Sequence, residues 1–230
     1  MSFNEVMNLP DGDMQCYAAG DRDSQTPAVI VVQEIFGVNA NIRKTVDRFA
    51  ENGFHAIAPD LFWRLRSGVE LDPELPESRG EAMRLAQLYS EDIERGIGDL
   101  SVLVTGLRER HRKVGMVGYC LGGRVAFIGW LKLGLDAVAS YYGVGLAPLL
   151  ESMVAPEKPL LMHLGKDDPL NPLDVQEAIS SRLGQESNVD VRFYEGVGHA
   201  FARLGASTYV KGAAGPADDA TLQFLREHLK

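Results

Sequence analysis

The stretch Gly118-Tyr119-Cys120-Leu121-Gly122-Gly123 joins an apolar run, residues 114–118, to a segment with helical periodicity. A sharp turn from a strand into a helix strains its central residue, so the residues two before and two after it must lack side chains. Gly118 and Gly122 meet that requirement around Cys120. We therefore expect the cysteine at the carboxyl end of a strand, beside a helix N-terminus that favours a thiolate and a developing oxyanion.

Short apolar runs rich in β-branched residues recur on both sides of this turn, separated by longer stretches of helical periodicity. The pattern is typical of βαβ units around a parallel sheet. We predict one α/β domain over residues 1–230, a mostly parallel sheet with helices on both faces. The expected strands are Ala28–Val32, His55–Pro59, 114–118, Ala137–Tyr141, 159–164 and Val189–Tyr194. The expected helices are 42–51, 79–110, 126–133 and 217–228. The first ends in a cap at Asn52-Gly53, and the second has a break at Gly96 or Gly98. Residues 66–78 are expected to form a loop over the sheet.

The composition narrows the class of function. The chain has 32 acidic and 23 basic residues, a net charge of −9, and no basic run, which disfavours a nucleic-acid partner. Two cysteines are too few for a disulfide framework and favour a reducing compartment. No stretch approaches the ~18 apolar residues of a membrane span, and the first residues do not resemble a signal peptide. We expect a cytoplasmic, monomeric protein that acts on small molecules.

A nucleophile needs a base, and the base needs a carboxylate to orient it. Asp168 follows one predicted strand and His199 follows the next, so the order after Cys120 is Asp and then His, as on an α/β-hydrolase sheet. We predict these three residues as a catalytic triad. Asp167 competes with Asp168, which is preferred because Gly165 stands three residues before it and Pro172 four after.

The cysteine and the histidine of this predicted triad each have a simpler, non-catalytic interpretation. A free cysteine is most often inert and buried, and a lone histidine is most often solvated or satisfied in the core. Cys16 has no turn around it and is expected to be inert. No pair of His or Cys has a zinc-type spacing, so the spacing does not indicate a zinc site.

Glu34 follows the apolar run Ala28–Val32 almost directly. A carboxylate so close to a buried strand is costly unless it is paired or functional, although a solvated strand end is the simpler interpretation. In the functional interpretation Glu34 lies across from Cys120, and the backbone N–H groups of Ile35 and Leu121 form an oxyanion hole.

Five segments together resemble the dienelactone hydrolase family. They are Gln33-Glu34-Ile35-Phe36-Gly37-Val38-Asn39, Ala58-Pro59-Asp60-Leu61, Val117-Gly118-Tyr119-Cys120-Leu121-Gly122-Gly123, Tyr141-Tyr142-Gly143-Val144-Gly145 and Gly198-His199-Ala200-Phe201-Ala202-Arg203. The resemblance covers nearly the whole chain. It implies an α/β-hydrolase fold and hydrolysis of dienelactone (carboxymethylenebutenolide) to maleylacetate in chloroaromatic degradation, without metal or cofactor.

The resemblance also assigns roles to residues. The triad falls on Cys120, Asp168 and His199, and Glu34 is the gating glutamate that holds the resting thiol until a substrate carboxylate displaces it. Arg79 and Arg203 bind that carboxylate, with Arg84 as a substitute for Arg79. Phe36 and Tyr142 fall in the substrate-binding region.

The chain departs from the family pattern at three positions. Ala200 stands where a serine is familiar, and Met83 and Ala86 stand where aromatic residues are expected. Substrate preference is therefore open. The alternatives are a broader carboxylesterase or thioesterase on the same triad, a non-catalytic binding protein, and a thiol redox sensor on Cys120, which the missing resolving cysteine disfavours.

Overall fold

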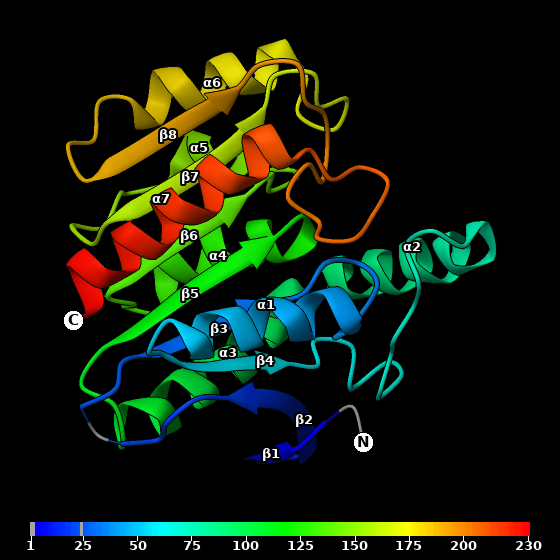
Figure 1. The fold of residues 1–230 in the computed structure, drawn as a ribbon, viewed down its shortest axis with the longest axis vertical. Coiled ribbons are helices and arrows are strands. Elements are labelled where there is room, and N and C mark those ends of the chain that lie inside the picture. Colours follow the sequence, from blue (N-terminus) through cyan, green and yellow to red (C-terminus); the bar gives the residue numbers. More distant parts are fainter. Residues whose placement is uncertain (1–2, 24) are drawn as a thin grey trace.

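The computed structural model describes residues 3–23 and 25–230, and over these residues eight strands form one sheet (Figure 1). The strand order is β1-β2-β4-β3-β5-β6-β7-β8. The pairs from β4 to β8 are parallel, whereas β2 runs antiparallel to both β1 and β4. The strands are β1 (Glu5–Leu9), β2 (Gly12–Ala19), β3 (Ala28–Val32), β4 (His55–Pro59), β5 (Val114–Tyr119), β6 (Ala137–Tyr141), β7 (Leu160–Gly165) and β8 (Val189–Tyr194).

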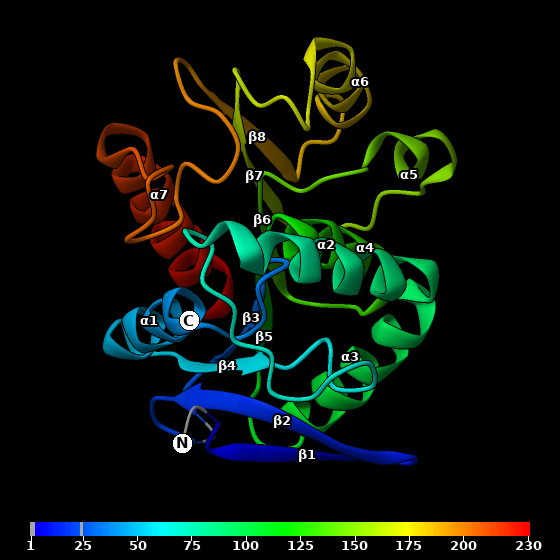
Figure 2. The same ribbon diagram turned by 90° about the vertical axis from the view of Figure 1, so that its right-hand side faces the viewer.

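Helices cover both faces of the sheet, and Figure 2 shows α1 and α7 on one side and α3 to α6 on the other. Each face buries its own apolar cluster, which is why the central strands β3 to β7 are buried at every residue. The predicted α/β-hydrolase class is confirmed. The helices are α1 (Ala40–Glu51), α2 (Pro76–Glu91), α3 (Ile93–Arg108), α4 (Leu121–Lys132), α5 (Ala147–Ser152), α6 (Leu173–Leu183) and α7 (Lys211–Leu229).

Strands β3, β4, β6 and β8 have the predicted bounds, and the other two predicted strands differ by one residue. The cap of α1 is confirmed, since Asn52 is its C-cap and Gly53 has φ +83°. The antiparallel hairpin β1–β2 was not predicted. Its sequence signal is the turn Pro10-Asp11-Gly12 between segments that alternate in burial.

Three helix boundaries were predicted wrongly. The break between α2 and α3 falls at Asp92, not at a glycine. Gly96 lies inside α3, where Tyr89 packs against it. A Cβ at this position would lie 2.2 Å from the Tyr89 Oη. Helix α4 begins at once after Cys120 despite its two glycines, and α7 begins before Pro216. The loop predicted over residues 66–78 ends earlier, since α2 starts at Pro76, and α5 and α6 were not predicted.

Helix α2 occupies a special place. It lies across the carboxyl ends of the strands, toward the viewer in Figure 2 and at the far right in Figure 1. The active-site loops of an open parallel sheet gather at this edge. No helix among the described residues is long and apolar enough to cross a membrane.

Candidate active site

Cys120 occupies the strained turn between β5 and α4, with φ 55° and ψ −114°. The turn closes only because glycines flank it. A Cβ on Gly118 would lie 1.9 Å from the Gly122 oxygen, and a Cβ on Gly122 would lie 2.4 Å from the Val32 oxygen. The second contact brings the start of α4 against the end of β3, so the segment after β3 lies beside Cys120.

Backbone bonds hold the cysteine in this position. The Cys120 N–H donates to the Tyr141 carbonyl on β6 at 3.0 Å, and the Cys120 carbonyl accepts from the Arg124 N–H at 3.1 Å. The side chain is 6% exposed. A strained, non-glycine residue fixed at a strand end is typical of a nucleophile presented to a cavity.

Asp168 and His199 meet beyond the ends of β7 and β8. His199 Nδ1 lies 2.8 Å from Asp168 Oδ2. Leu170 N donates to the other carboxylate oxygen at 2.8 Å, and Asn171 Nδ2 donates to Oδ2 at 3.1 Å. Asp168 is buried, whereas Asp167 is exposed, so it is Asp168 that the fold brings to the histidine.

The pair shifts both pKa values. Burial alone would lower the pKa of His199, but the hydrogen bond with Asp168 and the nearby Cys120 thiol raise it to about 10. Burial alone would raise the pKa of Asp168, and its bond with His199 holds that pKa below the usual value. His199 is therefore a strong proton acceptor whose charged form Asp168 stabilises.

Cys120 and His199 line one cavity, with Asp168 behind the histidine. His199 Nε2 is buried and has no hydrogen-bond partner among residues 3–23 and 25–230. A negative charge on the nearby Cys120 sulfur raises the pKa of His199, although no hydrogen bond joins the sulfur to Nε2 in this conformation. Catalytic hydrogen bonds are often loose before substrate binds.

The hydrogen-bond partner of Glu34 is Arg203, not the thiol that the resemblance implied. Its two carboxylate oxygens accept from Arg203 Nε at 2.6 Å and from Arg203 Nη2 at 3.2 Å, and both side chains are buried. In this conformation no hydrogen bond joins Glu34 to Cys120 in the described chain. Glu34 takes the edge of the Arg203 guanidinium formed by Nε and Nη2, which leaves the Nη1 edge for a second carboxylate.

Arg203 nevertheless keeps a free edge. Its Nη1 forms no hydrogen bond with any described residue, and the guanidinium lies 5.1 Å from the centre of the Phe36 ring. The ion pair with Glu34 raises the pKa of Arg203 against the effect of burial. A charged donor thus stays available at the cavity wall.

The backbone amide of Ile35 lies after β3, and that of Leu121 lies at the start of α4. Neither N–H donates to another residue in the described part of the chain. Because Gly122 packs on the end of β3, the two amides come from adjoining backbone segments. Two free N–H groups beside a nucleophile form a binding site for an oxyanion.

The cavity has a volume of about 370 Å³. Of the predicted substrate-binding residues, Phe36, Arg79 and Arg203 line it, and Tyr142 does not. Arg84 lies outside and pairs with Glu81 at 2.8 Å, so it does not substitute for Arg79. The lining residues are Ile35, Phe36, Arg79, Met83, Cys120, Pro169, Leu170, His199, Ala200, Arg203 and Thr208.

Tyr142 lies behind the histidine. Its ring meets the His199 ring edge to face at a centroid distance of 5.1 Å, and it is fully buried. Burial raises the pKa of Tyr142 well above its usual value. Of the positions that depart from the family pattern, Met83 and Ala200 line the cavity, whereas Ala86 does not.

Sequence reasoning missed Thr208, which lies in the cavity wall. Its Oγ1 donates to the Ala200 carbonyl at 3.1 Å, and the Arg203 N–H donates to the same oxygen at 3.0 Å. Ala200 has φ 60°, a conformation that side chains rarely adopt. The segment that carries both His199 and Arg203 is therefore tied back by Thr208, and nothing in the local sequence pattern indicates this bond.

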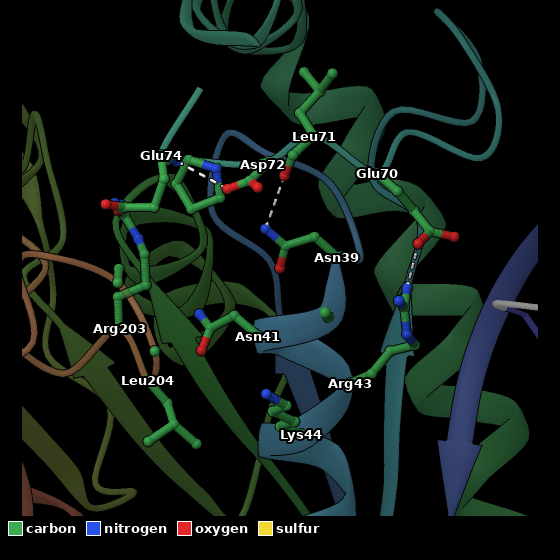
Figure 3. Close-up of a pocket in the computed structure, with 14 residues that line it drawn as sticks. Asn39, Asn41, Arg43, Lys44, Glu70, Leu71, Asp72, Glu74, Arg203 and Leu204 are labelled. Carbon is green, nitrogen blue, oxygen red and sulfur yellow. Dashed lines mark hydrogen bonds and ion pairs between the residues drawn. The ribbon is translucent and has the colours of Figure 1, made fainter. Parts of the chain in front are cut away.

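A second cavity, of about 290 Å³, lies on the other side of Arg203 (Figure 3). The start of α1, residues 70–74 and residues 203–206 line it. Two of its charged residues pair with each other, Arg43 with Glu70 at 2.6 Å. None of its lining residues is a Ser, Cys or His, so it has no candidate nucleophile or histidine base.

Cys16 lies elsewhere, in β2, where burial raises the pKa of its thiol.

Comparison with known proteins gives the chain a family context. The family model described as "Dienelactone hydrolase family" matches residues 14–229. A carboxymethylenebutenolidase of Pseudomonas putida is 39% identical over 202 residues, which cover 86% of this chain and 85% of that protein. Carboxymethylenebutenolidase 1 of Cupriavidus pinatubonensis is 32% identical over 224 residues, or 96% of this chain and 94% of that protein.

The fold has solved counterparts. A crystal structure from Klebsiella pneumoniae subsp. pneumoniae, named as a candidate dienelactone hydrolase, matches with a TM-score of 0.77 at 24% identity and covers 94% of each chain. At that identity the match concerns the fold alone.

Proposed function

Because the chain belongs to the dienelactone hydrolase family, whose members act on esters and lactones, we propose that it opens the ring of dienelactone with Cys120 as nucleophile. The product is maleylacetate, and the process it serves is chloroaromatic degradation. The observation that carries the proposal is the convergence of Cys120, His199 and two arginines on one cavity.

The reaction begins with a proton transfer. His199 takes the proton of the Cys120 thiol, and Asp168 stabilises the resulting imidazolium through the 2.8 Å bond. The sulfur then forms a bond to the lactone carbonyl carbon. The oxyanion of the tetrahedral intermediate accepts from the N–H groups of Ile35 and Leu121.

Collapse of that intermediate breaks the ring C–O bond, and His199 returns its proton to the departing oxygen. Water then attacks the thioester while His199 accepts a proton from it. The C–S bond breaks, a carboxylate is released and Cys120 leaves as the thiolate. No oxidant, reductant or further reactant is needed.

The substrate carboxylate binds between the free edge of Arg203 and the exposed Arg79. Arg203 is fixed by Glu34, whereas Arg79 has no ion-pair partner in the described ranges. A charge held at one end of a small lactone fixes where its carbonyl meets the sulfur. Competition between that carboxylate and Glu34 for Arg203 would free Glu34 from its ion pair. The gating role that the family resemblance implies would then start from the Arg203 pair, not from a bond to the resting thiol.

The test compares dienelactone with a neutral ester of similar reactivity, using the wild type, Arg203→Ala and Arg79→Ala. We expect fast lactone hydrolysis by the wild type and a loss of kcat/KM on the lactone alone in both variants. If the wild type hydrolyses the neutral ester as fast as dienelactone, and neither variant changes the rate on dienelactone, the enzyme is a broader esterase and the lactone assignment fails.

A further inference from the structure

The catalytic cavity has two chemically different walls. Arg79 and Arg203 give it a cationic side. The rest of the lining is mostly apolar, and Met83 and Leu170 are its most exposed apolar members, at 61% and 54%. A single exposed apolar side chain is ordinary, but two that converge on a nucleophile suggest a binding surface.

Leu170 belongs to the turn that carries the catalytic aspartate. Its N–H donates to Asp168 Oδ1 at 2.8 Å, so the backbone of Leu170 is fixed with respect to Asp168 and hence to His199. An apolar group bound there would lie beside the histidine that exchanges protons with the ester. Leu173, three residues further along and 69% exposed, lies outside this cavity.

Met83 comes from the opposite side, on α2. It follows Arg79 by four residues, so both project from the same face of the helix. One helix thus presents a positive charge and a flexible apolar side chain to one cavity. Methionine adapts its shape to irregular apolar partners.

The size of the cavity allows for an additional group. Its volume of about 370 Å³ falls in the range that holds drug-sized ligands, roughly 300–1,000 Å³, and a five-membered lactone with one carboxylate fills only part of it. With the carboxylate at the two arginines, the remaining volume would adjoin the apolar side chains of the lining.

We propose that this cavity accepts esters that join a carboxylate-bearing group to an apolar group of several carbons, with the apolar group between Met83 and Leu170. The proposal rests on the carboxylate binding and the Cys120 chemistry of the proposed function. The bonds made and broken are those of the same acyl transfer, with water as the second reactant and an acid and an alcohol as products.

The test uses two homologous series from methyl to hexyl. Monoalkyl succinates carry the charge on the acyl side, and O-acyl glycolates carry it on the alcohol side, so together they cover both orientations. We expect kcat/KM to rise about threefold per added methylene in at least one series, because each buried methylene contributes favourable transfer free energy.

Variants locate the effect. Leu170→Asn and Met83→Gln keep the side-chain size and are expected to flatten the rise, while the matched control Leu173→Asn keeps it. Equal rates along both series, or a rise that survives in both cavity variants, would overturn the proposal. Fast turnover of dienelactone without a chain-length effect would contradict this proposal but not the proposed function. Chain-length dependence without turnover of dienelactone would contradict only the assignment of dienelactone as substrate.

Discussion

The turn between β5 and α4 and the helix α2 border the same cavity, and they differ in how they are held. Gly122 in the turn touches the backbone of β3, and Cys120 is buried and bonded to β6. On α2, Arg79 and Met83 are exposed, and a Cβ on Gly80 would meet nothing within 4 Å. The proposed nucleophile thus lies on tightly packed backbone, and part of the proposed substrate-binding surface lies on a helix face open to solvent.

The two arginines test this difference with the largest expected effect. Arg203→Ala leaves Glu34 buried without its partner, which should lower the free energy of unfolding by about 3–5 kcal/mol. Arg79→Ala should change it by less than about 0.5 kcal/mol and act mainly on KM for carboxylate substrates. Urea unfolding and steady-state kinetics measure both quantities.

A companion variant separates stability from recognition. Glu34→Gln with Arg203→Met removes the buried charges together and should fold, yet still lose the preference for carboxylate substrates. Equal destabilisation by Arg79→Ala and Arg203→Ala would contradict the contrast between a buried ion pair and an exposed arginine on α2.

Matched glycine substitutions come next. Gly122→Ala places a methyl group 2.4 Å from the Val32 oxygen and should destabilise the protein by about 3 kcal/mol, with loss of activity. Gly80→Ala, in an open helical position, should stabilise it by about 0.5–1 kcal/mol and leave the backbone of the turn unchanged. Thermal unfolding of the two variants measures both changes in stability. A Gly122→Ala variant as stable as the wild type would show that the turn is not closely packed.

The His199–Asp168 pair predicts a dependence of stability on pH. The pKa of His199 is about 10 in the folded protein and near the ordinary value of 6.5 when unfolded, so the folded state binds the extra proton between these values. This contribution is complete below pH 6.5 and is lost as the pH rises toward 10. We expect the free energy of unfolding to fall over this window in the wild type, and an equal slope in His199→Gln would be evidence against the pair.

Thr208 gives the smallest effect. Thr208→Val removes the bond to the Ala200 carbonyl, worth about 1 kcal/mol, and should lower kcat several-fold and shift the pH profile of kcat/KM, with Thr208→Ser restoring both. Thr105→Val is the control, since the Thr105 hydroxyl bonds the Ser101 carbonyl on the exposed face of α3. Were the control to lose as much activity as Thr208→Val, a positioning role for Thr208 would be excluded.

The sequence was informative where the structural requirement is local. The glycines around Cys120 are needed by the turn itself, and Asp168 and His199 follow strands whose carboxyl ends must share one edge. The bulk of the sheet was predictable for the same reason, since buried parallel strands read as continuous apolar runs.

The sequence did not predict contacts between residues that are far apart along the chain. Glu34 and Arg203 stand 169 residues apart, and no sequence periodicity predicts the ion pair between them. The start of α4 was predicted late, and its two glycines are required by distant backbone: Gly122 by the end of β3, and Gly123 by Tyr141 and Gly143. The same holds for Gly96, which makes room for Tyr89 rather than ending a helix.

The most direct measurement is the location of the acyl group during turnover. The enzyme is quenched with acid while it hydrolyses a carboxylate-bearing aryl ester, then digested and mapped by mass spectrometry, with Cys120→Ala in parallel. We predict the acyl mass on the peptide that contains Cys120 in the wild type, none on the buried Cys16, and none in the variant. An acyl group on any other residue, or turnover by Cys120→Ala at the wild-type rate, would contradict the account.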